Sequence, residues 1–125
     1  MIKVDSLDKI YGKGATATQA LRGVSLQVAS GEFVAIMGRS GSGKSTLLHL
    51  LGLLDMPTHG EIYIDGQNVL NLSSEAQAQF RLGQLGYVFQ EFSLISEMTI
   101  HENVYFPAVC LARENHYRQR AKDML

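Results

Sequence analysis

The sequence predicts an α/β fold, and three features of the 125-residue chain indicate it. Residues 33–37, Phe-Val-Ala-Ile-Met, are continuously apolar, which is typical of a strand buried on both faces of a largely parallel sheet. A glycine-rich stretch follows, and leucines then recur on one face of a helix (Leu47, Leu50, Leu51 and Leu54). Residues 61–66 alternate polar and apolar side chains, which favours a half-exposed antiparallel strand. We therefore expect the apolar strand at the centre of the fold, with the helix packed on the sheet.

Further strands are predicted on either side of this centre. Residues 2–5 and 24–28 are expected to form two short strands joined by a hairpin loop near residues 11–16, whose two glycines favour a turn. Asp65-Gly66 is a turn dipeptide that follows the alternating strand. Residues 85–89 are a further strand candidate. The antiparallel strands are thus expected near the N-terminus.

Helices are predicted in the second half of the chain from their start signals. Two pairs have the spacing of a capping box, Ser74 with Gln77 and Thr99 with Glu102. The first predicts a helix to about Leu82, and the second predicts a helix that Pro107 should kink or interrupt. Residues 113–125 have the composition of a charged surface helix.

Composition excludes several classes of protein. The 11 basic and 12 acidic residues give a net charge of −1, so a general polyanion binder is not expected and nothing indicates nucleic-acid recognition. With 46% hydrophobic residues, the chain has enough apolar material for one domain with a core. The single cysteine, Cys110, excludes an intramolecular disulfide framework and is expected to be a small buried side chain. No secretory signal or membrane-spanning segment is expected.

Residues 38–45, Gly-Arg-Ser-Gly-Ser-Gly-Lys-Ser, match the phosphate-binding P-loop pattern. A triphosphate must be wrapped by backbone N–H groups, and glycines permit that approach because they carry no side chain and tolerate positive φ. Lys44 supplies a positive charge to the β- and γ-phosphates, and the helix beginning near Gly43 adds its N-terminal dipole. Ser45 is expected to place its hydroxyl on Mg²⁺. The position between a predicted strand and a helix supports this interpretation over a plain glycine-rich turn.

A P-loop ATPase also needs a carboxylate for the Mg²⁺ shell and a residue that orients the attacking water. Asp65 is better interpreted as a turn residue, because its strand alternates and Gly66 follows it. Asp55 is most simply a residue that terminates the helix. Gln90 closes the candidate strand 85–89, where open α/β sheets place groups that contact ligands. From position alone, a solvated loop glutamine is an equal alternative for Gln90.

Taken in order, these features resemble the nucleotide-binding domain of an ATP-binding cassette (ABC) transporter. The similarity is carried by five segments in family order, namely residues 20–26, 38–45, 57–66, 85–90 and 99–104. The chain looks most like the exporter branch that includes macrolide-export and lipoprotein-release ATPases. The resemblance implies a P-loop NTPase fold, an ABC-type ATPase core with an antiparallel β subdomain at the N-terminus. It also implies that residues from about 1 to 95 form this part, and that residues from about 96 to 125 begin a helical subdomain.

The resemblance also implies roles for individual residues. Tyr11 matches the aromatic residue that stacks on adenine, and Gln90 matches the glutamine that touches Mg²⁺ or the lytic water and senses the transmembrane partner. Lys44 and Gln90 are then the expected catalytic residues, and Ser45 and Gln90 the expected metal ligands. The residues expected to bind ATP are Tyr11, Gly38, Arg39, Ser40, Gly41, Ser42, Gly43, Lys44, Ser45 and Thr46.

The partners implied by the resemblance are ATP with Mg²⁺, a transmembrane permease subunit and a second nucleotide-binding domain joined head to tail in a homodimer. The expected location is cytoplasmic, peripheral at the inner face of the cell membrane. Residues 91–97 would lie near the permease, although Ser96-Glu97-Met98 replaces the more usual proline-containing turn. The resemblance covers only the N-terminal half of a family domain and ends before the Leu-Ser-Gly-Gly-Gln signature, the Mg²⁺-holding Asp, the catalytic Glu and the switch His.

A full-length parent is therefore expected to hydrolyse ATP and to power export or membrane extraction, whereas the 125-residue chain alone is expected to be inactive. Two alternatives remain within the family: a catalytically inactive, truncated nucleotide-binding module, and an ABC ATPase of the DNA-repair or translation type without a transport function. A small kinase or GTPase is a third, and the sequence has neither an Asn-Lys-x-Asp base reader nor an arginine-rich lid to support it.

Overall fold

The computed structural model describes residues 1–90, 93–109 and 114–124. The chain forms two units, Met1–Gln77 and Ala78–Leu125, each of which is described by itself. The division falls within helix α2 (Ser74–Gln84), whereas the subdomain boundary expected near residue 95 stays a prediction. Two predictions fall on residues outside the described ones. Cys110 is predicted to be buried, and Glu91 begins the segment predicted to lie near a permease.

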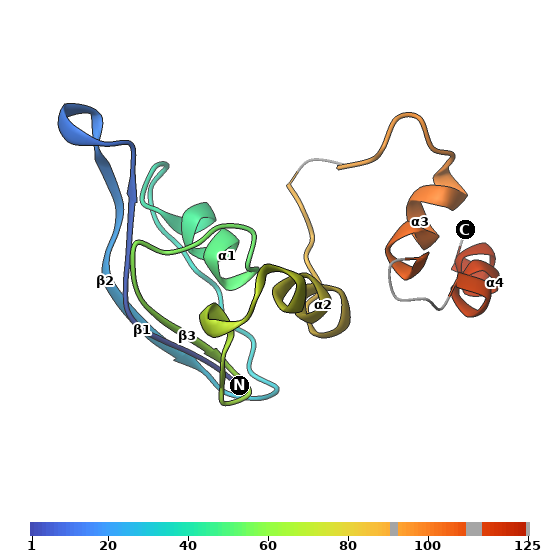
Figure 1. Cartoon of the computed structure of the whole chain (residues 1–125), viewed down its shortest axis with the longest axis horizontal. Coiled ribbons are helices and arrows are strands. Elements are labelled where there is room, and N and C mark those ends of the chain that lie inside the picture. Colours follow the sequence, from blue (N-terminus) through green and yellow to red (C-terminus); the bar gives the residue numbers. More distant parts are fainter. Residues whose placement is uncertain (91–92, 110–113, 125) are drawn as a thin grey trace. The chain divides into compact units, whose positions relative to one another are not determined.

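The first unit is built on a four-stranded antiparallel sheet with the strand order β2-β1-β3-β4 (Figure 1). The strands are β1 (Ile2–Tyr11), β2 (Thr18–Val28), β3 (His59–Ile64) and the short β4 (Gln67–Asn68). The predicted hairpin is confirmed, and both of its strands are longer than predicted because pairing continues from Ile2 opposite Val28 to Tyr11 opposite Thr18. A 3₁₀ turn (Gly14–Thr16) closes the loop between them. The predicted alternating strand is β3, which ends in a turn where Asp65 and Gly66 both have positive φ.

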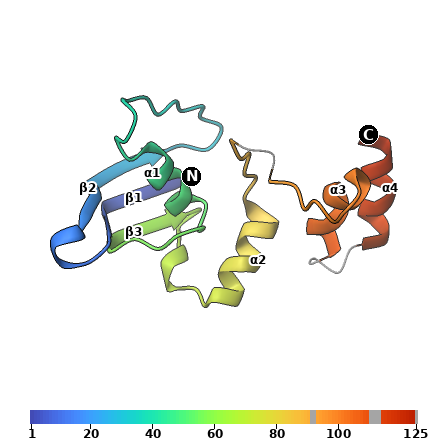
Figure 2. The same cartoon turned by 90° about the horizontal axis from the view of Figure 1, so that it is seen from above.

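The core of this unit lies between the sheet and helix α1 (Lys44–Leu51), which Figure 2 shows beside the strands. Its buried side chains come from the strands, from α1 and from the segments that follow α1 and β4: Val4, Leu7, Leu21, Leu47, Leu50, Leu53, Ile62, Ile64 and Val69. The predicted apolar face of the helix is correct for Leu47 and Leu50. It is wrong for Leu54, which is exposed, because the helix ends at Leu51 and the following turn buries Leu53 instead.

The predicted central strand at residues 33–37 is absent, as is the predicted strand at residues 85–89. Neither segment has regular secondary structure, and most of their apolar side chains are exposed, with Phe33 94% exposed and Val88 96% exposed. A strand that is apolar on both faces is stable only between paired neighbours. In the part of the chain that the structure describes, every ladder joins β1, β2, β3 and β4, so neither segment has a strand to pair with.

The capping residue of helix α2 lies one position before the predicted Ser74. The Ser73 hydroxyl accepts from the backbone N–H of Ala76 at 3.2 Å, so Ser73 is the capping residue and Ser74 is the first helical residue. The Gln77 side chain does not complete a capping box. It is buried, and its amide donates to the Val69 carbonyl at 3.1 Å, which anchors the start of α2 on the first unit.

The second capping box is confirmed at helix α3 (Ile100–Val109). The Glu102 carboxylate accepts from the Thr99 N–H at 2.8 Å, and the Thr99 hydroxyl accepts from the Glu102 N–H at 3.2 Å. Pro107 does not interrupt α3, which continues to Val109. The predicted charged helix is α4 (Glu114–Met124).

Asn103 fixes the segment that leads into α3. Its side-chain oxygen accepts from the Ile95 N–H at 2.8 Å, and its amide group lies within hydrogen-bonding distance of the carbonyls of Ile95, Met98 and Thr99. The Met98 N–H donates to the Ile95 carbonyl at 3.0 Å and closes the turn. The segment Ser96-Glu97-Met98 therefore forms a defined turn without a proline.

Candidate functional site

The glycine-rich loop between residues 38 and 43 has a conformation that side chains would prevent. Gly41 and Gly43 have φ of 76° and 90°, in the region that favours glycine. A Cβ on Gly43 would stand 2.6 Å from the Ala20 carbonyl oxygen of β2, and a Cβ on Gly38 would stand 2.7 Å from the Ser42 hydroxyl. Glycine at these positions therefore lets the loop fold tightly on itself and rest directly on β2.

Lys44 closes the loop from within. Its ammonium group donates to the carbonyl oxygens of Gly38 at 3.0 Å and Arg39 at 2.8 Å, while the Ser42 N–H donates to Arg39 at 3.2 Å. An ammonium has three hydrogens, so these two bonds leave one direction for a further acceptor. The side chain is half-buried, and its positive charge is held beside the exposed backbone of residues 38–42. The loop thus presents a fixed cation next to accessible N–H groups.

The start of α1 completes this cradle. Lys44, Ser45 and Thr46 form the first turn, in which backbone N–H groups have no partner within their own helix and the helix dipole is positive. The Ser45 hydroxyl is exposed, and Thr46 is half-buried. Bare backbone donors, one ammonium and an exposed hydroxyl form a donor set that fits a phosphate chain and its Mg²⁺.

Tyr11 lies at the same end of the sheet as this loop. It is the last residue of β1 and pairs with Thr18 of β2, close to the Ala20–Leu21 segment on which Gly43 rests. The Tyr11 side chain is exposed to 41% of its possible area. The strand pairing therefore brings two predicted parts of the site, the loop and the aromatic ring, to one end of the β1–β2 hairpin.

A charged cluster holds the Tyr11 ring. The Tyr11 hydroxyl donates to Asp55 Oδ2 at 2.9 Å, and Lys9 Nζ donates to Asp55 Oδ1 at 2.7 Å and to the Met56 carbonyl at 2.6 Å. The same ammonium lies 4.7 Å from the centroid of the Tyr11 ring. The hydrogen bond from Lys9 is the main cause that holds the pKa of Asp55 below its ordinary value of 3.8. Lys9 is only 9% exposed, so its charge is balanced locally by Asp55.

Sequence reasoning missed this cluster. The sequence predicts only a helix-terminating role for Asp55, and it predicts no role for Lys9. Lys9 and Tyr11 share a face of β1 because they are two residues apart on that strand, but the sequence predicted a strand only over residues 2–5 and a hairpin loop from Tyr11. The partner of Lys9 comes from a turn 46 residues away, and no local pattern indicates such a pairing.

The two remaining polar candidates differ. Asp65 is a turn residue as predicted, and its carboxylate accepts from the Met1 amino group. Gln90 lies in the second unit, exposed in a bend after α2, and the strand that was expected to position it is absent. Its assignment to metal or water stays a prediction.

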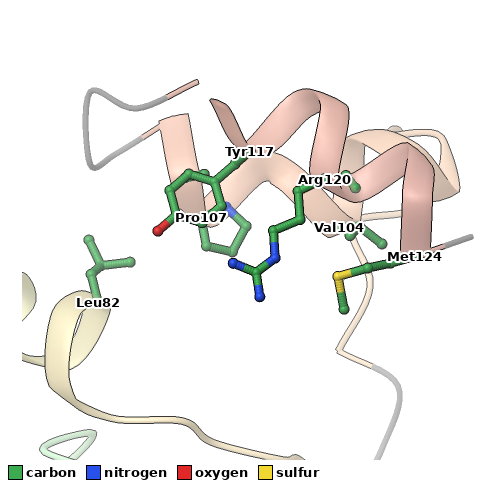
Figure 3. A pocket seen from close by; sticks show the side chains of 8 residues that line it. Leu82, Val104, Pro107, Tyr117, Arg120 and Met124 are labelled. Carbon is green, nitrogen blue, oxygen red and sulfur yellow. The ribbon is translucent and has the colours of Figure 1, made fainter. Parts of the chain in front are cut away.

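The second unit has a hollow of about 380 Å³, shown in Figure 3. Its lining is mainly apolar, with side chains of Val104 and Pro107 from α3 and of Tyr117, Arg120 and Met124 from α4. This hollow contains none of the predicted site residues.

Among residues 1–90, 93–109 and 114–124, no group of three or more His, Cys, Asp or Glu side chains could hold a metal ion. No helix in that described part is long and apolar enough to cross a membrane.

Comparison with known proteins supports the resemblance. The family model described as ABC transporter matches residues 21–125. The chain is 47% identical, over its whole length, to the uncharacterised ABC transporter ATP-binding protein MJ1508 of Methanocaldococcus jannaschii, and it spans 56% of that protein. Over 97% of the chain it is 48% identical to the macrolide export ATP-binding/permease protein MacB of Chlorobium phaeobacteroides, of which it spans 18%. Over 91% of the chain it is 46% identical to the lipoprotein-releasing system ATP-binding protein LolD of Shewanella frigidimarina, of which it spans 48%.

A solved structure agrees with this result. The dimeric post-hydrolysis state of the ATP-binding cassette MJ0796, bound to ADP and Pi, matches 98% of this chain with a TM-score of 0.89 and 41% sequence identity. The match spans 55% of that cassette. The predicted fold class, an ABC-type P-loop core of which the chain is a part, is confirmed.

Proposed function

The chain belongs to the ABC transporter family, and on this premise we propose that it is the ATP-binding part of an exporter, holding MgATP at residues 38–46. The full-length protein would hydrolyse ATP to drive export or membrane extraction of a substrate. The relatives whose names state an export or release function support the transport role over that of a non-transport ATPase.

The observation that carries this proposal is the conformation of the glycine-rich loop. Gly41 and Gly43 take positive φ, and Lys44 bridges the carbonyls of Gly38 and Arg39. A loop of this shape leaves backbone N–H groups available to phosphate oxygens, because no Cβ stands between them and a ligand. The adjoining first turn of α1 supplies further donors and a favourable dipole.

Within this proposal each predicted residue has a separate task. The backbone of Gly38, Arg39, Ser40, Gly41 and Ser42 wraps the phosphates, and Gly43, Lys44, Ser45 and Thr46 continue that cradle into the helix. Bound Mg²⁺ would neutralise charge that develops on the phosphates during transfer. The exposed Ser45 hydroxyl is the proposed protein ligand to the ion, with Gln90 as a second ligand or as the group that orients water. Tyr11 would stack on the adenine ring.

Hydrolysis, the permease and a second nucleotide-binding domain belong to the proposal for the full-length protein. The Leu-Ser-Gly-Gly-Gln signature that would close head to tail on this loop is not found in the 125 residues. A location at the inner face of the cell membrane, bound to a permease, follows from the same assignment. The chain by itself is proposed to bind nucleotide without turning it over.

The test is titration of the purified protein with MgATP in a calorimeter, with Lys44→Ala as the variant. We expect saturable binding that Lys44→Ala weakens at least about tenfold, because the variant removes the loop's internal bridge and its charge. Lys122→Ala, which removes an exposed lysine from helix α4, serves as the matched control and should bind normally. Equal affinity of the wild type and Lys44→Ala would refute the proposed site.

A further inference from the structure

We propose that Lys9 and Asp55 are positioning residues for the nucleobase, which hold the Tyr11 ring as a fixed stacking surface for a purine nucleoside triphosphate. This inference rests on the proposed function, because it assigns a task to residues beside the proposed nucleotide site. The hydrogen bonds of Lys9 and Asp55 are with each other, Met56 and Tyr11 and not with residues 38–43, so their effect should fall on the base and not on the phosphates.

Two contacts fix the ring in different directions. The hydroxyl of Tyr11 is tied to Asp55 Oδ2 at 2.9 Å, which sets the direction of the ring axis. The Lys9 ammonium stands 4.7 Å from the ring centroid, over one face, which restrains rotation about that axis. The ring of Tyr11, a residue that is 41% exposed, is thereby held in one orientation.

The polar contacts of the Lys9 ammonium group lie within this cluster. Its ammonium group makes two hydrogen bonds, to Asp55 Oδ1 at 2.7 Å and to the Met56 carbonyl at 2.6 Å, and it lies over the Tyr11 ring at 4.7 Å from the centroid. The side chain is nearly buried, so the charge acts on the ring with little screening by water. Asp55 in turn uses both carboxylate oxygens, one for Lys9 and one for Tyr11.

This arrangement favours base binding for two physical reasons. Ordering an exposed side chain on binding costs conformational entropy, and that cost falls when the ring is already fixed. A cation over one face also draws electron density from the ring, so the opposite face becomes a better partner for an electron-rich purine. With the ammonium on one face, the other face is the one that a base can approach.

The same sheet carries a matched control cluster. Lys3 lies 5.7 Å from the Tyr63 ring centroid, Lys3 pairs with Asp5 at 3.8 Å, and the Tyr63 hydroxyl donates to Glu61 at 2.7 Å. This cluster has the same kinds of side chains, but it lies toward the opposite end of β1 from Tyr11. Lys3 is more exposed than Lys9, so Lys3→Met controls for the loss of a lysine beside a tyrosine ring on this sheet, away from the proposed base site.

The experiment measures dissociation constants for MgATP and for inorganic tripolyphosphate with magnesium, by calorimetry on the purified protein. Tripolyphosphate has the phosphates but no base, so the ratio of the two constants isolates the base contribution. We expect Lys9→Met to weaken MgATP binding about five- to tenfold and to change tripolyphosphate binding less than about twofold. Lys3→Met should leave both constants unchanged.

A second variant, Tyr11→Phe, tests the proposal even if Lys9→Met does not fold. Tyr11→Phe retains the ring and the Lys9–Asp55 pair and removes only the hydroxyl tie, so we expect MgATP binding to weaken about two- to threefold. In a Tyr11→Ala background, Lys9→Met should have no further effect on MgATP binding, because the ring through which it acts is gone. A purely structural role of Lys9 would persist in that background.

The outcomes separate the two proposals. Equal weakening of MgATP and tripolyphosphate by Lys9→Met, or the same effect with and without Tyr11, would overturn the positioning role while leaving the proposed nucleotide site intact. If the wild type bound neither ligand, the proposed function would fail and the positioning role with it.

Discussion

The two units of this chain differ in how much of their apolar surface they bury by themselves. The first unit, residues 1–77, contains nine buried aliphatic side chains that link three strands, α1 and the segments after α1 and β4. Among the described residues of the second unit, only Ala108 and Ala121 are buried apolar side chains. Larger ones are exposed there: Val88, Phe89, Leu94, Ile95, Ile100, Val104, Phe106, Val109 and Met124.

The difference shows that the elements of the two units are held by different kinds of contact, strand pairing in the first unit and local hydrogen bonds at a helix start in the second. β1 pairs with its sequence neighbour β2 and also with β3, which follows after the glycine-rich loop and α1, so the antiparallel sheet of the first unit is completed within residues 1–68. The start of helix α3 is instead defined by local contacts, a capping box and the Asn103 hydrogen bonds. The phosphate loop is attached to the unit with the core, which gives a binding loop the rigid support it requires.

Truncation of a core leucine should show the largest difference between the units. We expect Leu50→Ala to lower the free energy of unfolding by about 3 kcal/mol, because its side chain is fully buried between α1 and the sheet. Val104→Ala in the second unit should cost less than about 1 kcal/mol, since that side chain is exposed. Urea unfolding followed by far-ultraviolet circular dichroism measures both.

A control on the same helix separates burial from helix propensity. Leu48→Ala removes an exposed leucine from α1 and should change stability by no more than about 0.5 kcal/mol. Equal losses for Leu48→Ala and Leu50→Ala would contradict the described core.

Local signals in the sequence predicted the parts of the fold that are completed locally. The hairpin at residues 11–16, the alternating strand β3, the Asp65-Gly66 turn and the Thr99 capping box are all present. The hairpin, the turn and the capping box depend on residues that are close in the chain, whereas β3 pairs with the distant β1 and was predicted only from its own alternating pattern. The strand predictions at residues 33–37 and 85–89 were wrong. A continuous apolar run indicates a segment that needs burial, but it does not indicate which neighbouring strands would cover that segment.

The candidate site also has one part that the sequence predicts and one part that it does not predict. The P-loop is a contiguous pattern, and its folded shape follows from its own glycines and Lys44. Tyr11 could be proposed only from the family resemblance, and its support by Lys9 and Asp55 joins segments that are far apart in the chain. Pairings of this kind depend on the folded sheet, so the sequence alone could not predict them.

Removal of the second capping box should have an intermediate effect that is confined to α3. Thr99→Ala deletes the hydroxyl that accepts from the Glu102 N–H and should cost about 1 kcal/mol of helix stability. Hydrogen exchange of amides in residues 100–104 measures it, and those amides should exchange about five times faster while the amides of β1 are unchanged.

Thr99→Ser is the matched variant, because it keeps a hydroxyl at the cap, and it should exchange close to the wild-type rate. Faster exchange throughout the first unit in Thr99→Ala would contradict this expectation, because it would show that the start of α3 is not independent of the core of the first unit.

Acid should have the smallest effect, and it should act on the first unit through Asp55. The hydrogen bond from Lys9 lowers the pKa of Asp55 in the folded protein below 3.8, so protons bind this carboxylate more readily in the unfolded chain. The stabilisation is therefore complete at neutral pH and is lost as the pH falls below about 4 toward the lowered pKa. The Asp55 side chain is 32% exposed, which screens the charge pair and keeps the effect modest.

The variant Asp55→Asn isolates this contribution, since it keeps the shape and the acceptor oxygen and cannot ionise. We expect the wild type to be the more stable protein at pH 6, with a difference in urea midpoint that shrinks as the pH is lowered toward 3, because protonation makes the two side chains alike. A difference that stays constant over this range would mean that the Lys9–Asp55 charge pair contributes nothing to folding. The long-range tie would then stabilise the first unit through its hydrogen bonds alone, as the capping box does for α3.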